Sequence, residues 1–217
     1  MKKHIVCLGD SNTHGYCGDP ADCADSALLR FNEDERWTCR LQAALGSEYL
    51  VVEEGLSGRT TVFRDPLYEG LAAIDYLVPC LKSHEPVALL LIMLGTNDTK
   101  ERFAANAHCI ALGMERLVKR AQGVDCWGGK APNILIVAPP VIDPRMETSV
   151  VGHYMGAGSA AKSRALPPLL SATARQTGCH FLNAGSCQFN QSDYMHLTRR
   201  GHAQLAEQLA ALVPELV

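Results

Sequence analysis

The sequence lacks several features that would place it in a specialised class of protein. Its longest purely apolar run, Val87 to Leu94, is far shorter than the roughly 20 residues that a membrane-spanning helix needs. It has no internal repeat, no low-complexity tract and no linker. Its 20 basic and 23 acidic residues give a net charge of −3, so charge gives no reason to expect a nucleic-acid partner.

The cysteines lack the spacing of a metal or redox motif. Nine are present and no two are spaced as C-x-x-C, which argues against a zinc ribbon or a thioredoxin-type site. We interpret them as reduced thiols of a cytoplasmic protein, and a Cys17–Cys23 disulfide is the alternative. The start of the chain has only a short apolar stretch, His4–Leu8, instead of the apolar core of about 7–15 residues typical of a signal peptide. We therefore expect a first strand there.

What the sequence does contain is an alternation of apolar runs and helical stretches. Apolar positions at helical spacing predict helices around residues 110–121 and 205–213. The continuous apolarity of Val87–Leu94 favours a strand covered on both faces. The predicted strands are His4–Leu8, Tyr49–Val52, Val87–Leu94, Ile134–Ala138 and His180–Leu182. Together they predict one domain over residues 1–217: a flavodoxin-like α/β/α sandwich with a five-stranded parallel sheet of order 2-1-3-4-5.

Small and polar residues follow the first three predicted strands. These segments are Gly9–Thr13, Glu53–Thr60 and Gly95–Asp98. In an open parallel sheet, ligands bind beyond the carboxyl ends of the strands, near a reversal of strand order. With the order 2-1-3-4-5 these three ends are neighbours, so they predict a binding or catalytic site.

Ser11 is the candidate nucleophile, although a serine in this position can also serve as a helix N-cap. A serine hydroxyl needs an adjacent base. His196 is the candidate base because Asp193 precedes it by three residues and could orient its imidazole. The alternative is a solvated loop aspartate followed by a histidine at a helix start.

An acyl-transfer site also needs hydrogen-bond donors where the oxyanion develops. The candidates are the backbone N–H groups of Ser11 and Gly58 and the side-chain amide of Asn97. A turn glycine and a turn or cap asparagine are the alternatives. Two long segments outside the alternation, residues 16–34 and 139–160, are either functional loops or surface insertions.

Taken together, these motifs resemble the SGNH hydrolase superfamily, also called GDSL-type esterases. The matching blocks are Gly9-Asp10-Ser11, Gly58, Gly95 to Asp98, and Asp193 to His196, with Asn12 where leucine is more usual. The stretches Glu53–Ser57 and Ile92–Lys100 are similar to the bacterial arylesterase and acyltransferase branch. The resemblance implies Ser11 as nucleophile, His196 as general base and acid, Asp193 as its orienting partner, and Ser11, Gly58 and Asn97 as the oxyanion hole.

The function implied is a serine esterase for small acyl esters that works through an acyl-enzyme, with acyl transfer to another alcohol as a further outcome. The resemblance implies a homo-oligomer that needs no metal or cofactor, and the short apolar runs give no reason to expect a membrane partner. It also implies that Asp10 holds the strand-to-helix turn, and that Trp37, Asp98 and Thr99 line or support the pocket. An esterase for acetylated sugars is the first alternative. The second is a non-catalytic nucleotide-binding module, although no phosphate-cradling motif is present.

Overall fold

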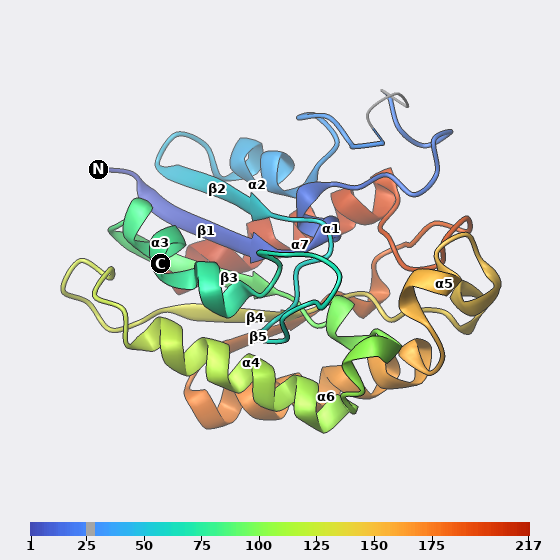
Figure 1. Cartoon of the computed structure of the whole chain (residues 1–217). Helices are drawn as coiled ribbons and strands as arrows, with labels where there is room; N and C mark the ends of the chain where they lie inside the picture. The colour runs from blue at the N-terminus through green and yellow to red at the C-terminus, as the bar shows by residue number, and fades with distance from the viewer. Residues whose placement is uncertain (25–28) are drawn as a thin grey trace.

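The computed structural model describes residues 1–24 and 29–217 of the chain. At its centre lies one parallel sheet of five strands in the order β2-β1-β3-β4-β5 (Figure 1). The predicted strand order is therefore confirmed. The strands are β1 (Lys3–Gly9), β2 (Tyr49–Gly55), β3 (Val87–Met93), β4 (Ile134–Ala138) and β5 (His180–Asn183).

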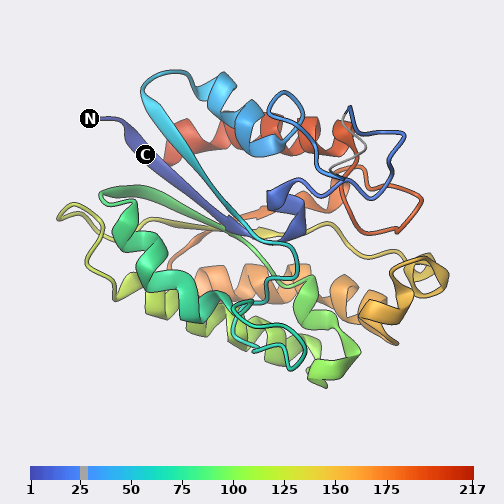
Figure 2. The ribbon, with the colours of Figure 1, turned by 45° about the horizontal axis from the view of Figure 1, so that its top comes forward.

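Helices cover both faces of this sheet, which makes the predicted α/β/α sandwich. Helices α2 and α7 lie on one face, and α3, α4 and α6 lie on the other (Figures 1 and 2). The long helices are α2 (Trp37–Leu45), α3 (Ala73–Ser83), α4 (Ala107–Gln122), α6 (Ser159–Thr177) and α7 (Arg199–Leu216). The short ones are α1 (Ser11–His14), α5 (Gly152–Met155) and the 3₁₀ turns η1 (Asn97–Thr99), η2 (Glu101–Phe103), η3 (Pro144–Thr148) and η4 (Ala184–Ser186).

The hydrophobic core has two layers, one on each face of the sheet, and alternate residues of a strand contribute to each. On β1, Ile5 and Cys7 pack with the α2 and α7 side, whereas Val6 and Leu8 pack with the α3, α4 and α6 side. All four side chains are fully buried. Since successive strand residues point to opposite faces, a strand covered on both faces must be apolar throughout, which explains the unbroken apolar run in β3.

The predicted boundaries differ from the observed ones mainly at β2. This strand continues past Val52 to Gly55, in register with Cys7 to Gly9 of β1. The sequence suggested a loop there because Glu53 is charged, but its carboxylate accepts two hydrogen bonds of 3.0 Å from the buried Arg36. At β3 the strand ends at Met93, one residue before the predicted end. The two predicted helices are found within α4 and α7.

The long segment 139–160 is not a detached insertion. It contains η3 and α5 and forms a small apolar cluster beside the carboxyl end of the sheet. Its buried members are Ile142, Met146, Met155, Ala160 and Met195. In the other long segment, 16–34, the part that includes Asp25 lies outside the described residues.

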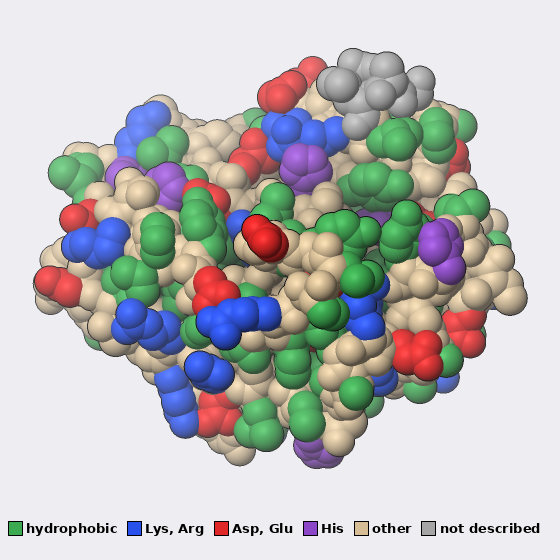
Figure 3. Space-filling model, viewed as in Figure 1, with side chains coloured by type: hydrophobic (Ala, Val, Ile, Leu, Met, Phe, Trp, Pro, Cys, Tyr) green, Lys and Arg blue, Asp and Glu red, His purple; other side chains and the backbone are tan. Residues whose placement is uncertain are grey.

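The carboxyl ends of all five strands point to one edge, and the two termini lie at the opposite edge (Figure 1). Because β2, β1 and β3 are neighbours, the three polar segments that follow them meet. Acidic and basic side chains are interspersed over the face in Figure 3. Among the described helices, none has the length and apolarity to span a membrane. All nine cysteines lie in the described ranges and none is in a disulfide, so a Cys17–Cys23 bridge is not present.

Candidate active site

The turn after β1 places the Ser11 side chain at the sheet edge. Ser11 is the first residue of the short helix α1, and Asp10, not Ser11, is its N-cap. The Asp10 carboxylate accepts the N–H of Asn12 at 3.0 Å, so Asp10 holds the turn as expected. Ser11 is 5% exposed. Its hydroxyl is thus free of a capping role and faces the cavity.

Asp193 and His196 lie in the loop between β5 and α7. One oxygen of Asp193, Oδ1, accepts the backbone N–H groups of Met195 and His196, each at 3.0 Å. The other oxygen, Oδ2, lies 2.7 Å from His196 Nδ1. Tyr194, between them, has a φ of +62°, a conformation that is uncommon outside glycine. The loop is therefore folded tightly around the carboxylate.

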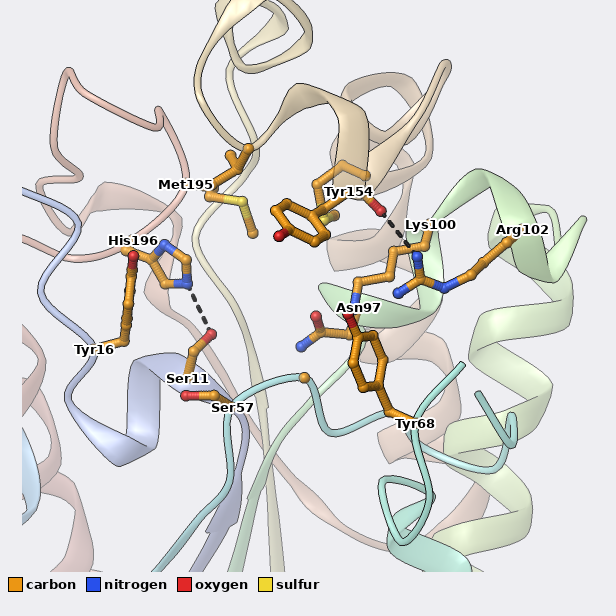
Figure 4. Close-up of a pocket in the computed structure, with 13 residues that line it drawn as sticks. Ser11, Tyr16, Ser57, Tyr68, Asn97, Lys100, Arg102, Tyr154, Met195 and His196 are labelled. Carbon is orange, nitrogen blue, oxygen red and sulfur yellow. Dashed lines mark hydrogen bonds between the residues drawn. The ribbon is translucent and has the colours of Figure 1, made fainter. Parts of the chain in front are cut away.

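The structure brings Ser11 and His196 together from opposite ends of the chain. Ser11 Oγ lies 2.8 Å from His196 Nε2, across 185 positions of sequence (Figure 4). Because the carboxylate of Asp193 can only accept, His196 Nδ1 carries the proton and Nε2 is left to accept from the Ser11 hydroxyl. This is the arrangement in which an imidazole can remove a proton from a nucleophile.

The surroundings of Asp193 stabilise its ionised carboxylate. Burial by itself raises the pKa of Asp193, but the hydrogen bond and charge of His196 and the two backbone donors outweigh it and hold the pKa below its usual value. Asn190 fixes the same loop, since its side chain accepts the N–H of Asp193 at 2.8 Å and donates to the carbonyl of His196 at 3.1 Å. The Tyr16 ring packs on the imidazole, 4.7 Å between centroids.

Two of the predicted oxyanion donors come from the neighbouring loops. Gly58 has a φ of +87°, which a glycine adopts without strain, and its N–H has no acceptor among the described residues. Asn97 donates one amide hydrogen to the carbonyl of Arg59 at 3.2 Å. Since an amide carries two hydrogens, the second is available to the cavity, which both residues line together with Ser11.

A second set of hydrogen bonds joins the loop that carries Gly58 to the turn that carries Asn97. The carboxylate of Asp98 accepts the N–H of Thr61 at 2.9 Å and also its hydroxyl. Burial raises the pKa of Asp98 to about 6, and burial likewise raises that of Asp10 to about 6. The Gly58 loop and the Asn97 turn are therefore fixed to each other by at least two contacts.

Of the three other residues named from the resemblance, none lines the cavity; all three support it. The indole of Trp37 donates to the carbonyl of Asn12 at 3.0 Å, Asp98 makes the hydrogen bonds just described, and the Thr99 hydroxyl donates to the carbonyl of Thr96 at 2.6 Å.

The cavity has a volume of about 230 Å³. Sequence reasoning missed most of its wall. The missed lining residues are Tyr16, Ser57, Tyr68, Lys100, Arg102, Val151, Tyr154, Met155 and Met195. Several come from the two long segments, whose lack of periodicity was the one available signal.

One group of described residues has the ligand types of a metal site. Atoms of Glu54, Cys80 and His84 lie within 4.8 Å of one another. None of the three lines the cavity. His84 Nε2 already contacts the Glu54 carboxylate at 2.7 Å, and burial raises the pKa of the Cys80 thiol to about 12, which opposes the thiolate that a metal requires.

Comparison with known proteins identifies the family of the chain. The model of the GDSL-like lipase/acylhydrolase family matches residues 7–204. The chain belongs to this family. No curated protein matched the sequence. The matched residues include all five predicted site residues, from Ser11 to His196.

Three solved structures of GDSL-type relatives resemble the whole chain. The aryl esterase of M. smegmatis is 37% identical, with a TM-score of 0.85, and the match covers 99% of this chain and 100% of that one. A carbohydrate acetylesterase from Sinorhizobium meliloti is 36% identical, with a TM-score of 0.86 and full coverage of both chains. A carbohydrate acetylesterase family member from the same organism is 32% identical, with a TM-score of 0.88, covering 99% of this chain and 98% of that one.

Proposed function

We propose that the protein is a serine carboxylesterase that cleaves small acyl esters, with Ser11 as nucleophile. The observation that carries this proposal is the chain of contacts from Ser11 Oγ to His196 Nε2 at 2.8 Å and from His196 Nδ1 to Asp193 at 2.7 Å. Both distances are within the range for proton transfer. Family membership and esterase relatives support the same conclusion.

In the proposed reaction, Ser11 Oγ attacks the ester carbonyl carbon while its proton passes to His196 Nε2. The carbonyl oxygen becomes an oxyanion, which accepts from the N–H groups of Ser11 and Gly58 and from the Asn97 amide. The bond to the alcohol oxygen then breaks, and His196 gives its proton to the leaving alcohol. Water, activated by His196, cleaves the acyl-enzyme and regenerates Ser11. A second alcohol in place of water gives acyl transfer.

The size of the cavity supports a small acyl group. About 230 Å³ is below the range of about 300–1,000 Å³ typical of sites for drug-sized ligands. Tyr16, Tyr68 and Tyr154 line it, and such rings present an apolar face with a polar tip. Two of the acetylesterase relatives act on carbohydrate, so an acetylated sugar is the second candidate substrate. The nucleotide-binding alternative gains no support from these relatives.

The test of the proposal is covalent labelling. A fluorophosphonate should label the native protein, and mass spectrometry of the peptides should place the adduct on Ser11. Ser11→Ala should abolish both the label and the hydrolysis of p-nitrophenyl acetate, whereas Ser57→Ala, at the other serine of the cavity, should keep the label. Hydrolysis by Ser11→Ala at the parent rate would refute the proposal.

We further propose one catalytic domain over residues 1–217, a cytoplasmic location and a homo-oligomer. The single sheet and the extent of the family match support the first. Nine thiols without a disulfide support a reducing compartment. The homo-oligomer rests on the similarity of Glu53–Ser57 and Ile92–Lys100 to the arylesterase and acyltransferase branch. Light scattering that gives the mass of one chain would contradict the oligomer.

A further inference from the structure

The wall of the cavity is positively charged although the whole chain is not. Lys100 and Arg102 both line it, and none of the described lining residues is acidic. The chain as a whole has a net charge of −3. A cluster of one sign beside a nucleophile bears on which substrates are attracted to the site. The two cations differ in whether they already have a partner.

Arg102 has one. Its guanidinium donates to a single carboxylate oxygen of Asp65 from Nη2 at 3.0 Å and from Nε at 3.2 Å, and to the carbonyl of Tyr154 at 3.4 Å. The Asp65 side chain is fully buried. Arg102 therefore holds the loops around the cavity together, and its charge is balanced within the protein.

Lys100 has none. The residue is only 7% exposed, yet its ammonium forms no hydrogen bond or ion pair with any described residue. In Figure 4 its side chain points into the cavity on the side of Asn97. An ammonium carries three donors and no acceptor, so all three N–H groups of Lys100 are left to bind a ligand in the cavity. Burial, then the charge of Arg102, lowers the pKa of Lys100 more than the carboxylates of Asp65, Asp10 and Asp98, which attract its charge without a hydrogen bond, raise it.

The backbone fixes Lys100 in this place. Its N–H donates to the carbonyl of Asn97 at 3.2 Å. The carbonyl of Thr99, just before it, accepts from the Ser159 hydroxyl at 3.1 Å and from Lys162 Nζ at 3.0 Å. Lys100 thus belongs to the same rigid turn as the Asn97 amide. It also lines the hollow next to the cavity, where the exposed Glu69 forms no ion pair with it.

We propose that Lys100 is a substrate-binding residue and that the preferred ester carries a carboxylate, which pairs with its ammonium. This inference rests on the proposed esterase function and narrows its substrate class. The carboxylate can belong to the acyl part or to the alcohol part of the ester, since Lys100 lines both the cavity and the hollow beside it. A charge-assisted hydrogen bond to the largely buried Lys100 would then add to binding.

The test compares matched anionic and neutral esters. For the alcohol side the pair is 4-acetoxybenzoate and methyl 4-acetoxybenzoate; for the acyl side it is monomethyl and dimethyl glutarate. Each is measured as kcat/KM on the wild type, Lys100→Met, which keeps the length without the charge, and Lys100→Arg, which keeps the charge. Lys130→Met is the control, because it removes an exposed lysine before β4, at the opposite edge of the sheet.

Lys100→Met should lower kcat/KM for the anionic member of at least one pair by about 10–100-fold, and should change that for the neutral member by less than about 3-fold. Lys100→Arg should recover most of the loss, and Lys130→Met should lose nothing. The pair that responds tells which part of the ester carries the carboxylate. An equal loss on anionic and neutral esters would overturn the proposal, because Lys100 would then act on the reacting carbonyl.

Binding separates this proposal from the esterase function. In Ser11→Ala, calorimetry should detect glutarate or 4-acetoxybenzoate, and adding Lys100→Met should abolish that binding. Equal binding in both proteins would overturn the role of Lys100 whether or not any ester is cleaved. Failure of the wild type to cleave any of the four esters in a Ser11-dependent way would instead overturn the esterase function.

Discussion

Asp193 accepts three hydrogen bonds, and only one of them concerns the imidazole directly. The two from the backbone N–H groups of Met195 and His196 shape the loop. The third, from His196 Nδ1, selects the tautomer. One carboxylate therefore both folds the loop and prepares the base, and a substitution can separate these two tasks.

Asp193→Asn should keep the fold and lose most of the activity. The amide oxygen can still accept the backbone N–H groups, but its NH₂ group cannot accept from Nδ1, so Nε2 would carry the proton and could not receive that of Ser11. We expect kcat/KM to fall roughly 10³–10⁴-fold with little change in melting temperature. Steady-state kinetics and circular dichroism check both parts, and near-parental activity would contradict the assigned role.

The buried His202 sets an acid limit on stability. It is fully buried, accepts the N–H of Trp37 at 3.2 Å, and has no partner at Nε2 among the described groups. Burial lowers the pKa of His202 from 6.5 to about 3. As the pH falls, His202 is therefore protonated in the unfolded chain before it is protonated in the folded protein. The contribution of His202 to stability is complete above about pH 6.5 and is lost as the pH falls toward 3.

In His202→Asn, whose amide oxygen can replace the Nδ1 acceptor, this loss should be absent. The free energy of unfolding of the parent should drop between pH 7 and pH 5 by about 2 kcal/mol more than that of the variant. Urea titration at the two pH values measures the difference. Asp10 and Asp98 act in the opposite direction in both proteins, so they cancel in the comparison. An equal pH dependence would exclude this role.

The proposed catalytic and oxyanion-hole residues were predictable from the sequence because each occupies a short polar segment between a strand and a helix. Ser11, Gly58 and Asn97 follow β1, β2 and β3, and Asp193 and His196 precede α7. Lys100 and Tyr154 were not predicted. Lys100 lies in the same turn as Asn97, but a lysine there gives no signal in the sequence of whether its side chain enters the cavity. The place of Tyr154 depends on how the irregular segment 139–160 returns to the cavity, and no periodic pattern encodes that path.

At the level of elements, the loop after β2 places the N–H of Gly58, a proposed oxyanion donor, at the cavity. A Cβ at Gly58 would lie 3.1 Å from Leu71 Cδ1, and its φ of +87° is unfavourable for alanine. Gly70 has a similar φ of +74° but open space around it. Alanine substitutions at the two glycines thus separate two effects: the loss of stability from a positive φ, which both share, and the displacement of the Gly58 N–H, which only one can cause.

Gly58→Ala and Gly70→Ala should each cost about 1 kcal/mol of stability, measured by urea unfolding. Only Gly58→Ala should also lower kcat, by 10-fold or more and up to about 10²–10³-fold if the oxyanion contact is lost. Equal kcat values for the two variants would show that the Gly58 N–H does not take part.

The strands and long helices follow from hydrophobic pattern, and the exceptions have physical causes. β2 extends through Glu53 because Arg36 neutralises it, which is a tertiary contact that local sequence does not reveal. α1, α5 and the 3₁₀ turns have too few residues for periodicity to indicate them.

At the scale of the whole molecule, the nine thiols differ strongly in accessibility. Cys109 is exposed, Cys39 and Cys179 are half-buried, and the other six are buried. Burial also raises the pKa of several of them, as for Cys126 at about 11, and a protonated thiol is a poor nucleophile. Reactivity toward a thiol reagent therefore reports on the packing of the entire fold.

Ellman's reagent should modify one thiol rapidly in the native protein and all nine in denaturant. Cys109→Ser should remove the rapid phase and leave the melting temperature within about 1 °C, since surface substitutions change stability little. A Cys39→Ser variant is the comparison and should keep the rapid phase. Several rapid thiols in the native state would contradict the packing described here.

The contact between Ser11 and His196 across 185 positions has a consequence for biosynthesis. The proposed nucleophile, Ser11, is synthesised 185 residues before the proposed base, His196. Until the last loop has docked on the sheet, Ser11 has no group to remove its proton. We therefore expect ester hydrolysis to begin only after the loop that carries His196 has docked on the sheet.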